Sequence, residues 1–410
     1  MKTIGIVAEF NPFHSGHHHL LAEARRLSGA DFAIVVMSGN FVQRGAPAIL
    51  DKYVRTQMAL MNGADLVVEL PLCYATASAE YFARGAVCLL ERLGVVDELW
   101  FGSEGGEIAA LAATAALLDN EGAVYRSVLR DELKNGASFA LARGRAIDSS
   151  SQSSHGDPAA IMAQPNNILA VEYIRALSFF ASTIKPMTIK REGSGHHGSV
   201  AQTGEFPSAT ALRGLLHAAS DPAPFVPQGI LPLYGTATHY LHEDDFSALL
   251  RYKLLMEAGS GYTDFFDVSA DISAKISKTL AHSAAYGYSD FIHALKSRDL
   301  TYLRLSRCLC HILLDIREDD IAAYREGGYV FYARMLGFGE GADGLLRAIK
   351  RQSAIPLLSK LADADRLLDT KGRKMLAQDV RAAHIYESVR CQKYGGEVRN
   401  EYRQGIVKNL

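Results

Sequence analysis

The first hundred residues alternate between short apolar runs and stretches with apolar residues at helical spacing. The apolar runs, rich in Val, Ile and Leu, occupy residues 3–10, 32–38, 65–70 and 98–102. Between them, residues 17–27, 51–61 and 77–93 carry apolar side chains three or four positions apart, which predicts helices. Strand, helix, strand in this order predicts a parallel sheet covered by helices on both faces, which places the protein in the α/β class.

The pattern changes along the rest of the chain. Helical spacing continues at 107–118 and 124–135, and the Ser, Gly, Asp and Pro content of 147–158 predicts a loop. A helix is expected at 165–180, a short strand near 188–191, a Gly-rich segment at 194–199 and a helix start at Ser208. Mainly helical spacing follows, clearest at 302–316 and 344–352. We therefore expect one α/β domain over residues 1–222 and a mainly α-helical domain over residues 223–410.

Composition adds constraints on partners and compartment. The 410 residues are 48% hydrophobic, enough to bury substantial cores, and the net charge is -2. Residues 345–410 hold 14 Lys and Arg against 7 Asp and Glu, a basic excess that favours a polyanionic partner. The five cysteines form no CxxC pair, so neither a zinc site nor a disulfide framework is expected. No apolar run reaches about 18 residues and no basic leader precedes the first strand, which predicts a cytoplasmic protein without a membrane segment.

Four histidines stand where the first predicted helix begins, in NPFHSGHHH at residues 11–19. In a parallel sheet this junction lies at the carboxyl edge, where free backbone N–H groups and the helix dipole favour a phosphate. His14 and His17 are placed to donate to phosphate oxygens, and Gly16 lets the backbone approach closely. Consecutive helical residues diverge by about 100°, so the cluster does not converge on one metal ion. Phosphate binding is favoured, with a metal site and solvated histidines as the alternatives.

Two motifs of this chain resemble those of a known superfamily. NPFHSGH after a first strand resembles the HxGH signature of nucleotidyltransferases, which join the α-phosphate of a nucleotide to an acceptor and release pyrophosphate. PSATALR, at 207–213, is similar to their second motif and places Arg213 at its basic position. Further segments extend the likeness in order: VVMSGNFVQRG (35–45), ADLVVELP (64–71), FGSE (101–104), QPNNILAVEYIRAL (164–177) and KREGSGHH (190–197). Together they resemble the bacterial tRNA(Met) cytidine acetate ligase family over most of residues 1–215, while the C-terminal half matches less distinctly.

This resemblance implies a fold and a reaction. It implies a Rossmann-like nucleotidyltransferase domain that uses ATP, with Mg²⁺, to activate acetate as acetyl-adenylate. The acetyl group then passes to the exocyclic amine of the wobble cytidine of elongator tRNA(Met). The expected partners are therefore acetate and the anticodon arm of tRNA(Met), and the oligomeric state stays open. A nucleotidyltransferase that adds AMP or CMP to a small metabolite is the main alternative, and a non-catalytic nucleic-acid-binding protein is another.

The resemblance also assigns residues. The expected catalytic residues are His14, His17 and Arg213. The expected ATP-binding residues are Val7, Ala8, Glu9, Phe10, Asn11, Pro12, Phe13, His14, Ser15, Gly16, His17, His18, His19, Leu20, Gly102, Asn166 and Arg191. No metal-ligating residue is assigned.

Some of these positions have an ordinary structural explanation as well. Gly102 suits a plain turn, Asn166 a helix cap, and Arg191 an exposed surface position. Asn167 is an alternative to Asn166 because the two are adjacent. Glu104, and Glu9 before the phosphate turn, are candidates for positioning Mg²⁺ or water, and helix capping explains Glu104 equally well.

Two further groups of polar residues remain open between a binding role and ordinary solvation. After the second strand, the loop at 38–47 and the helix behind it carry candidates for binding the acceptor carboxylate or a phosphate: Asn40, Gln43, Arg44, Lys52 and Arg55. In the basic C-terminal segment, Lys and Arg residues interleave with Tyr386, Tyr394 and Tyr402, a mixture suited to gripping an anticodon arm. A solvated helical face is the alternative for that segment.

Overall fold

A mostly parallel sheet forms the centre of the fold. The computed structural model describes residues 1–120, 122–134, 139–150, 157–191, 208–236, 239–282 and 286–409. Five parallel strands stand in the order β5-β2-β1-β6-β7: β1 (Thr3–Ala8), β2 (Phe32–Ser38), β5 (Leu66–Leu70), β6 (Glu98–Ser103) and β7 (Lys185–Lys190). The predicted α/β class with a parallel sheet is confirmed.

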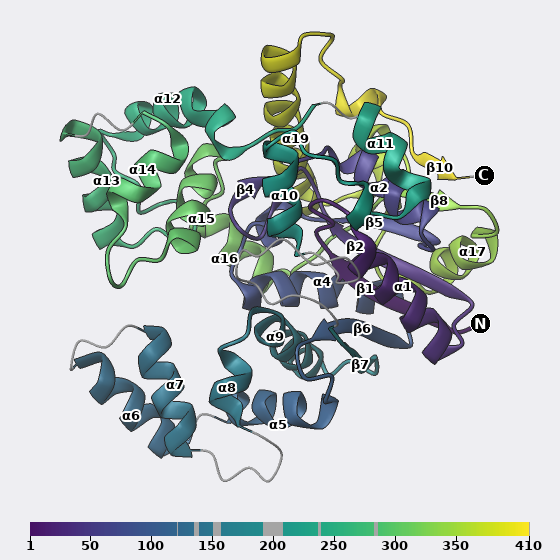
Figure 1. The fold of residues 1–410 in the computed structure, drawn as a ribbon, viewed down its shortest axis with the longest axis horizontal. Helices are drawn as coiled ribbons and strands as arrows, with labels where there is room; N and C mark the ends of the chain where they lie inside the picture. The colour runs from purple at the N-terminus through teal and green to yellow at the C-terminus, as the bar shows by residue number, and fades with distance from the viewer. Residues whose placement is uncertain are drawn as a thin grey trace.

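Strand β2 shows why apolar runs form this sheet. Ile34 and Val36 belong to the larger core, which includes residues of α4 (Ala79–Leu93) and α9 (Pro165–Phe179). Their neighbours Ala33, Val35 and Met37 belong to a second core with α1 (Ser15–Ser28) and α2 (Lys52–Met61). Alternate residues of a strand point to opposite faces, so a strand buried on both sides must be apolar at every position. Figure 1 shows these helices against the sheet.

The C-terminal part of the chain extends the same sheet. Strand β8 (Ala333–Gly339) pairs antiparallel with β5, and β9 (Leu357–Leu358) and β10 (Val407–Asn409) pair parallel with β8. The sequence pattern did not predict these strands, because β9 and β10 are very short and β8 contains three residues that are Gly or Arg. The division of the chain near residue 222 stays a prediction, but residues on both of its sides share one sheet.

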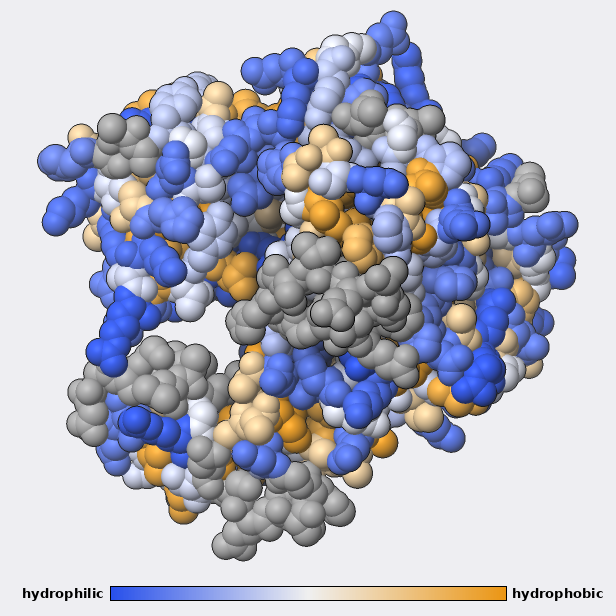
Figure 2. Space-filling view, in the orientation of Figure 1, coloured by the Kyte–Doolittle hydropathy of each residue, from blue (hydrophilic) through white to orange (hydrophobic). Residues whose placement is uncertain are grey.

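Two groups of helices project from the sheet layers (Figure 1). The first follows β6 and comprises α5 (Ile108–Asp119), α6 (Ala123–Lys134), α7 (Phe139–Ser150) and α8 (Pro158–Met162). The second comprises α12 (Ser247–Glu257), α13 (Ala270–His282), α14 (Tyr288–Leu295) and α15 (Tyr302–Leu313). In Figure 2 an open notch separates the two groups.

The remaining elements link these parts. They are α3 (Leu72–Ala75), α10 (Ala209–His217), α11 (Leu231–Thr236), α16 (Glu318–Glu326), α17 (Asp343–Gln352), α18 (Ala364–Leu367) and the long α19 (Thr370–Tyr394). Short 3₁₀ turns lie at Ala223–Phe225, Gln228–Ile230, Glu243–Phe246, Leu361–Asp363 and Glu401–Arg403. No helix in the described ranges combines the length and the apolar character needed to cross a bilayer.

Most expected elements appear within a few residues of their predicted bounds. The helix expected to begin near His17 begins at Ser15, and the predicted loop at 147–158 is helical as far as Ser150. Residues 151–156, the Gly-rich segment 194–199 and Pro207 lie outside the described residues. Because the five central strands are parallel, the segments that follow β1, β2, β6 and β7 all emerge at one edge of the sheet. The candidate site residues stand on these segments, apart from Val7, Ala8 and Gly102, which lie at the ends of β1 and β6.

Candidate functional site

Two histidines close the first turn of helix α1 against each other. His14 is the N-cap, and its Nδ1 accepts a hydrogen bond from the Gly16 N–H at 3.1 Å. In return, Nδ1 of His17 accepts from the His14 N–H at 3.2 Å. The rings stack with centroids 3.7 Å apart and planes 26° apart. This reciprocal pair is a capping box in which both acceptors are imidazoles.

These bonds fix which nitrogen of each ring carries a proton. A neutral imidazole that accepts at Nδ1 must carry its hydrogen on Nε2, so each ring offers one Nε2–H donor. Burial lowers the pKa of His14 to about 3, and the nearby charges of Arg191 and Arg213 add to the effect. Burial likewise places the pKa of His17 well below its usual value, with contributions from His14 and Arg191. Both rings are therefore neutral near pH 7, and each can offer an anion a hydrogen-bond donor but not a positive charge.

The segment between β1 and α1 packs against the His14–His17 pair and holds the turn in place. Phe10 and Phe13 are buried, and their ring centroids lie 4.9 and 5.6 Å from that of His17. The buried side chain of Asn11 accepts from the Ile49 N–H at 2.8 Å. Ser15 donates its hydroxyl to the Phe225 carbonyl at 2.9 Å. Much of the predicted ATP segment, residues 7–20, thus shapes the turn. His14 and His17 supply the Nε2–H donors.

Arg213 reaches this turn from a distant part of the chain. Ser208 caps α10 by accepting from the Ala211 N–H at 3.1 Å, and Arg213 follows one turn later. Its guanidinium donates to the Asn11 carbonyl at 2.7 Å and to the Thr210 hydroxyl at 3.0 Å. Burial and the charge of Arg44 lower the pKa of Arg213 to about 10, so it remains a cation near pH 7. The structure thus brings the two motifs of the sequence together.

A second cluster forms where β6 and β7 end. Arg191 donates to the Asn166 side-chain oxygen at 2.9 Å, and its backbone N–H donates to the Ser103 carbonyl at 2.8 Å. A Cβ on Gly102 would lie 3.3 Å from Cγ of Arg191, so the glycine leaves room for the arginine chain. Gly102, Asn166 and Arg191 therefore lie together, although they are separated by up to ninety positions in the sequence.

Glu104 acts as a cap for helix α9. One carboxylate oxygen accepts from the Asn166 N–H at 3.1 Å and from its side-chain amide at 2.7 Å. The other accepts from the Asn167 N–H at 2.8 Å, and the Asn167 side chain accepts from the Glu104 N–H at 3.0 Å. The capping explanation of Glu104 is thus the one the structure supports. Asn166 does not cap α9 with its side chain. It connects Glu104 to Arg191.

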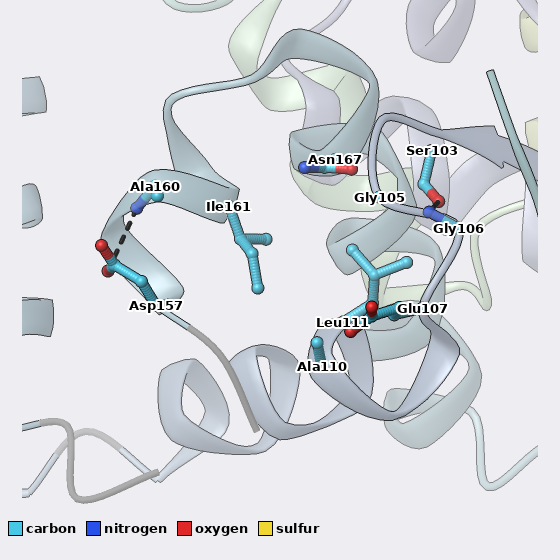
Figure 3. Close-up of a pocket in the computed structure, with 10 residues that line it drawn as sticks. All are labelled: Ser103, Gly105, Gly106, Glu107, Ala110, Leu111, Asp157, Ala160, Ile161 and Asn167. Carbon is cyan, nitrogen blue, oxygen red and sulfur yellow. Dashed lines mark hydrogen bonds between the residues drawn. The ribbon is translucent and has the colours of Figure 1, made fainter. Parts of the chain in front are cut away.

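A cavity of about 300 Å³ adjoins this cluster (Figure 3). Ala110, Leu111 and Ile161 give it an apolar wall, and Asn167 turns its amide nitrogen toward the side of Ile161 in the figure. The full lining is Ser103, Gly105, Gly106, Glu107, Ala110, Leu111, Asp157, Ala160, Ile161 and Asn167. The cavity borders Gly102, Asn166 and Arg191 without including them, and it includes Asn167, the alternative to Asn166.

Two of the cations after β2 are structural. Arg55 is fully buried and donates to the backbone carbonyls of Glu9 at 2.7 Å, Ser38 at 3.0 Å, Leu50 at 2.9 Å, and also Gly39. It therefore ties the end of β1 to the end of β2. Neither alternative left open by the sequence, anion binding or solvation, fits Arg55 and Lys52, because protein groups enclose and satisfy both.

Lys52 belongs to a buried charge cluster, which we define as Lys52, Glu69, Arg334 and Glu401. Its ammonium lies 2.9 Å from a carboxylate oxygen of Glu69 and 2.9 Å from one of Glu401. Arg334 pairs with Glu69 at 3.0 Å and also with Glu401. Burial would raise the pKa of Glu401, but Lys52 and Arg334 hold it at about 2. Two positive and two negative charges balance inside the fold.

The basic C-terminal residues do not form one free face. Tyr386 is fully buried and donates to the Ala48 carbonyl at 2.8 Å. Arg390 and Arg399 both pair with Glu387, and Lys393 pairs with Asp245. Tyr402 is exposed, but Arg347, Lys350 and Arg351 lie on α17, well away from α19 (Figure 1). Part of the basic excess thus stabilises the fold, and an RNA-binding role for the rest stays a prediction.

Metal-ligating side chains do not cluster in the described residues. No group of three or more His, Cys, Asp or Glu side chains converges there in a way that would hold an ion. Five cysteines lie in these ranges, and all are free thiols.

Comparisons with known proteins agree with this geometry. Residues 1–400 match the HIGH Nucleotidyl Transferase family. A tRNA(Met) cytidine acetate ligase of Acetivibrio thermocellus is 36% identical over 99% of this chain and 100% of the relative. One from a Thermoanaerobacter species is 38% identical over 94% of this chain and 95% of the relative. A crystal structure of Thermotoga maritima TmcAL bound with alpha-thio ATP superposes with a TM-score of 0.89 and 28% identity, covering 100% of both chains.

Proposed function

Because this chain belongs to the tRNA(Met) cytidine acetate ligase family of HIGH nucleotidyl transferases, we propose that it uses ATP to activate acetate and acetylates the wobble cytidine of elongator tRNA(Met). One observation of the site carries the proposal. His14 and His17 stand stacked at the start of α1 as two neutral donors, with the cation Arg213 beside them. Such a site suits a triphosphate, because it combines directed N–H groups with positive charge.

In the proposed complex the phosphates of ATP lie over the first turn of α1. The capping bonds already use the backbone N–H groups of His14 and Gly16, so the two Nε2–H groups are the main donors there. Arg213 supplies formal positive charge for the β- and γ-phosphates, which become the leaving pyrophosphate. The nucleoside end of ATP lies toward β6 and β7, next to Gly102, Asn166 and Arg191.

The reaction then proceeds in two balanced steps. An acetate oxygen attacks the α-phosphorus, the bond to the bridging oxygen breaks, and pyrophosphate leaves with the electron pair. The product is acetyl-adenylate. The exocyclic nitrogen of the cytidine next attacks the acetyl carbonyl carbon, AMP leaves, and the nitrogen loses a proton to solvent. Holding reactants in line and stabilising charge on the phosphates are the contributions of the protein.

We propose that Mg²⁺ enters with ATP. Glu104 is not free to bind it, because both of its carboxylate oxygens accept N–H bonds at the start of α9. Glu9, the other candidate from the sequence, lies beside the phosphate turn, and one of its oxygens accepts from the Gln43 N–H at 2.9 Å. Mg²⁺ commonly binds one or two carboxylates together with phosphates and water. Glu9 and the triphosphate fit that set, and the ion would offset phosphate charge.

One incubation tests the proposed function. The protein is mixed with ATP, labelled acetate and total bacterial tRNA, and the RNA is digested to nucleosides. Label in N4-acetylcytidine, together with one AMP and one pyrophosphate per transfer, is the expected result. Omission of ATP is the control. Label from ATP in a stable small-molecule product, with none from acetate in RNA, would contradict the proposal and favour a metabolite nucleotidyltransferase.

A further inference from the structure

Among the polar residues that follow β2, the structure separates those that bond to other protein groups from Arg44, which within the described ranges does not. Lys52 and Arg55 are fully buried and paired with protein groups. Asn40 is also buried, and its side-chain oxygen accepts from the Lys52 N–H at 2.9 Å. Arg44 is different: it is half-buried, and within the described part of the chain it has neither a hydrogen-bond nor an ion-pair partner. We propose that Arg44 binds the carboxylate of acetate during adenylation, an assignment that rests on the function proposed above.

The backbone around Arg44 is held firmly. Arg44 lies at the tip of a hairpin formed by β3 (Phe41–Val42) and β4 (Ala46–Pro47). On one side of the tip, the Gln43 N–H donates to Glu9 at 2.9 Å, next to the phosphate turn. On the other side, the Ser306 hydroxyl of α15 donates to the Gly45 carbonyl at 2.9 Å.

Gly45 explains why the tip fits so closely against α15. Its φ is +73°, a conformation that side-chain-bearing residues rarely adopt. A Cβ there would also lie 2.4 Å from the backbone nitrogen of Arg307. Helix α15 therefore sets the position from which the Arg44 side chain extends, which is the kind of rigid support that a binding residue needs.

The hairpin places Arg44 beside the proposed reaction centre, because the N–H of its neighbour Gln43 bonds to Glu9 next to the phosphate turn. The charge of Arg44 also lowers the pKa of Arg213, whose guanidinium donates to the Asn11 carbonyl of the same turn. Glu9 and Glu243 act on Arg213 in the opposite direction, but neither is paired with Arg44. Two cations brought together in partly desolvated surroundings favour an anion between them. The triphosphate is one such anion, and the carboxylate of the acid substrate is the second that the reaction requires.

Sheet topology separates these two anions. Strand β1 stands between β2 and β6, and the nucleoside contacts lie beyond β1 at the ends of β6 and β7. Arg44 follows β2, on the opposite side of the phosphate turn. In-line displacement requires the attacking oxygen to approach the α-phosphorus opposite the leaving pyrophosphate. A guanidinium on the β2 side is suited to hold the attacking carboxylate, because its planar fork matches the two oxygens.

The test measures acetate-dependent exchange of labelled pyrophosphate into ATP, with and without tRNA. We expect Arg44→Gln to raise the KM for acetate about 10- to 150-fold, the effect of losing a hydrogen bond to a charged group, with the KM for ATP nearly unchanged. Arg44→Lys keeps the charge but loses the fork, so a smaller rise is expected. Arg298→Gln removes an exposed arginine from the helical group and is the matched control. Ser306→Ala, which loosens the hairpin tip, should raise the KM for acetate by less than Arg44→Gln.

Two outcomes bear on the Arg44 assignment, and a third bears on the proposed function. A rise in the KM for ATP, or loss of the ATP-induced increase in Tm, would assign Arg44 to the phosphates and overturn the proposal. An unchanged KM for acetate in Arg44→Gln would overturn it as well. If the wild-type protein shows no acetate-dependent exchange at all, the proposed function itself fails. The wild-type measurement thus separates the failure of the function from the failure of the Arg44 assignment.

Discussion

Replacing His17 separates two roles that one imidazole performs. Its Nδ1 accepts from the His14 N–H at 3.2 Å, and its Nε2–H is proposed to donate to ATP. His17→Ala removes both. Loss of the cap should lower the free energy of unfolding by about 1 kcal/mol, the usual effect of removing a helix cap. Loss of a donor to a developing oxyanion should slow adenylation about 10²- to 10³-fold, or roughly 3–4 kcal/mol of transition-state stabilisation.

His17→Gln is the matched variant, because glutamine at the third helical position commonly accepts from the N-cap N–H. It should keep nearly wild-type stability in urea while still losing most of the adenylation rate. Pyrophosphate exchange measures the rate, and urea unfolding followed by circular dichroism measures stability. Exchange by His17→Ala at the wild-type rate would remove His17 from the chemistry. Equal destabilisation of both variants would refute the capping argument.

Three further predictions concern the surroundings of the site. The unfolded chain protonates His14 below about pH 6.5, whereas the folded chain does so only near pH 3. As the pH falls from 6.5 toward 3, His14 therefore lowers the free energy of unfolding by about 1.4 kcal/mol for each pH unit. His14→Asn, which retains a capping side chain, should flatten that slope in urea titrations at pH 7.5 and 5.5; an unchanged slope would contradict the assignment. Glu104→Ala should destabilise helix α9 by about 1–2 kcal/mol and raise the KM for ATP, because Asn166 loses its support. An unaltered KM would separate Asn166 from nucleotide binding. Lys52→Met should cost about 3–5 kcal/mol in urea unfolding, because it leaves the charge cluster unbalanced, and a loss below 1 kcal/mol would show that the cluster relaxes.

The parts of the fold that could be predicted are those that local pattern determines. The apolar run of β2 is buried on both faces, and His14 lies at a helix start that the sequence marks with Gly and Pro nearby. The antiparallel pairing of β8 with β5 could not be predicted, because it joins residues about 270 positions apart. The hairpin that carries Arg44 has strands of two residues each, too short to show any periodicity.

For the site too, local sequence pattern could predict some residues and not others. Arg213 could be connected to the phosphate turn only through resemblance, since its contact with Asn11 spans 202 positions. For Lys52, local spacing could not decide between anion binding and solvation, and the structure shows neither. Its burial depends on Glu69 and Glu401, which local spacing does not reveal. The neutrality of His14 likewise could not be predicted, because it follows from burial of the ring and from the hydrogen bond that its Nδ1 accepts from the Gly16 N–H.

The buried charge cluster sets an order for folding while the protein is being synthesised. Lys52 and Glu69 leave the ribosome before Arg334, and Arg334 leaves it before Glu401. A nascent chain that has made Arg334 but not Glu401 would have to enclose a net positive charge between β5 and β8, which is strongly unfavourable. We therefore expect the pairing of β5 with β8 around this cluster to become stable only after Glu401 has been made, and chains that stop between Arg334 and Glu401 to remain sensitive to proteolysis.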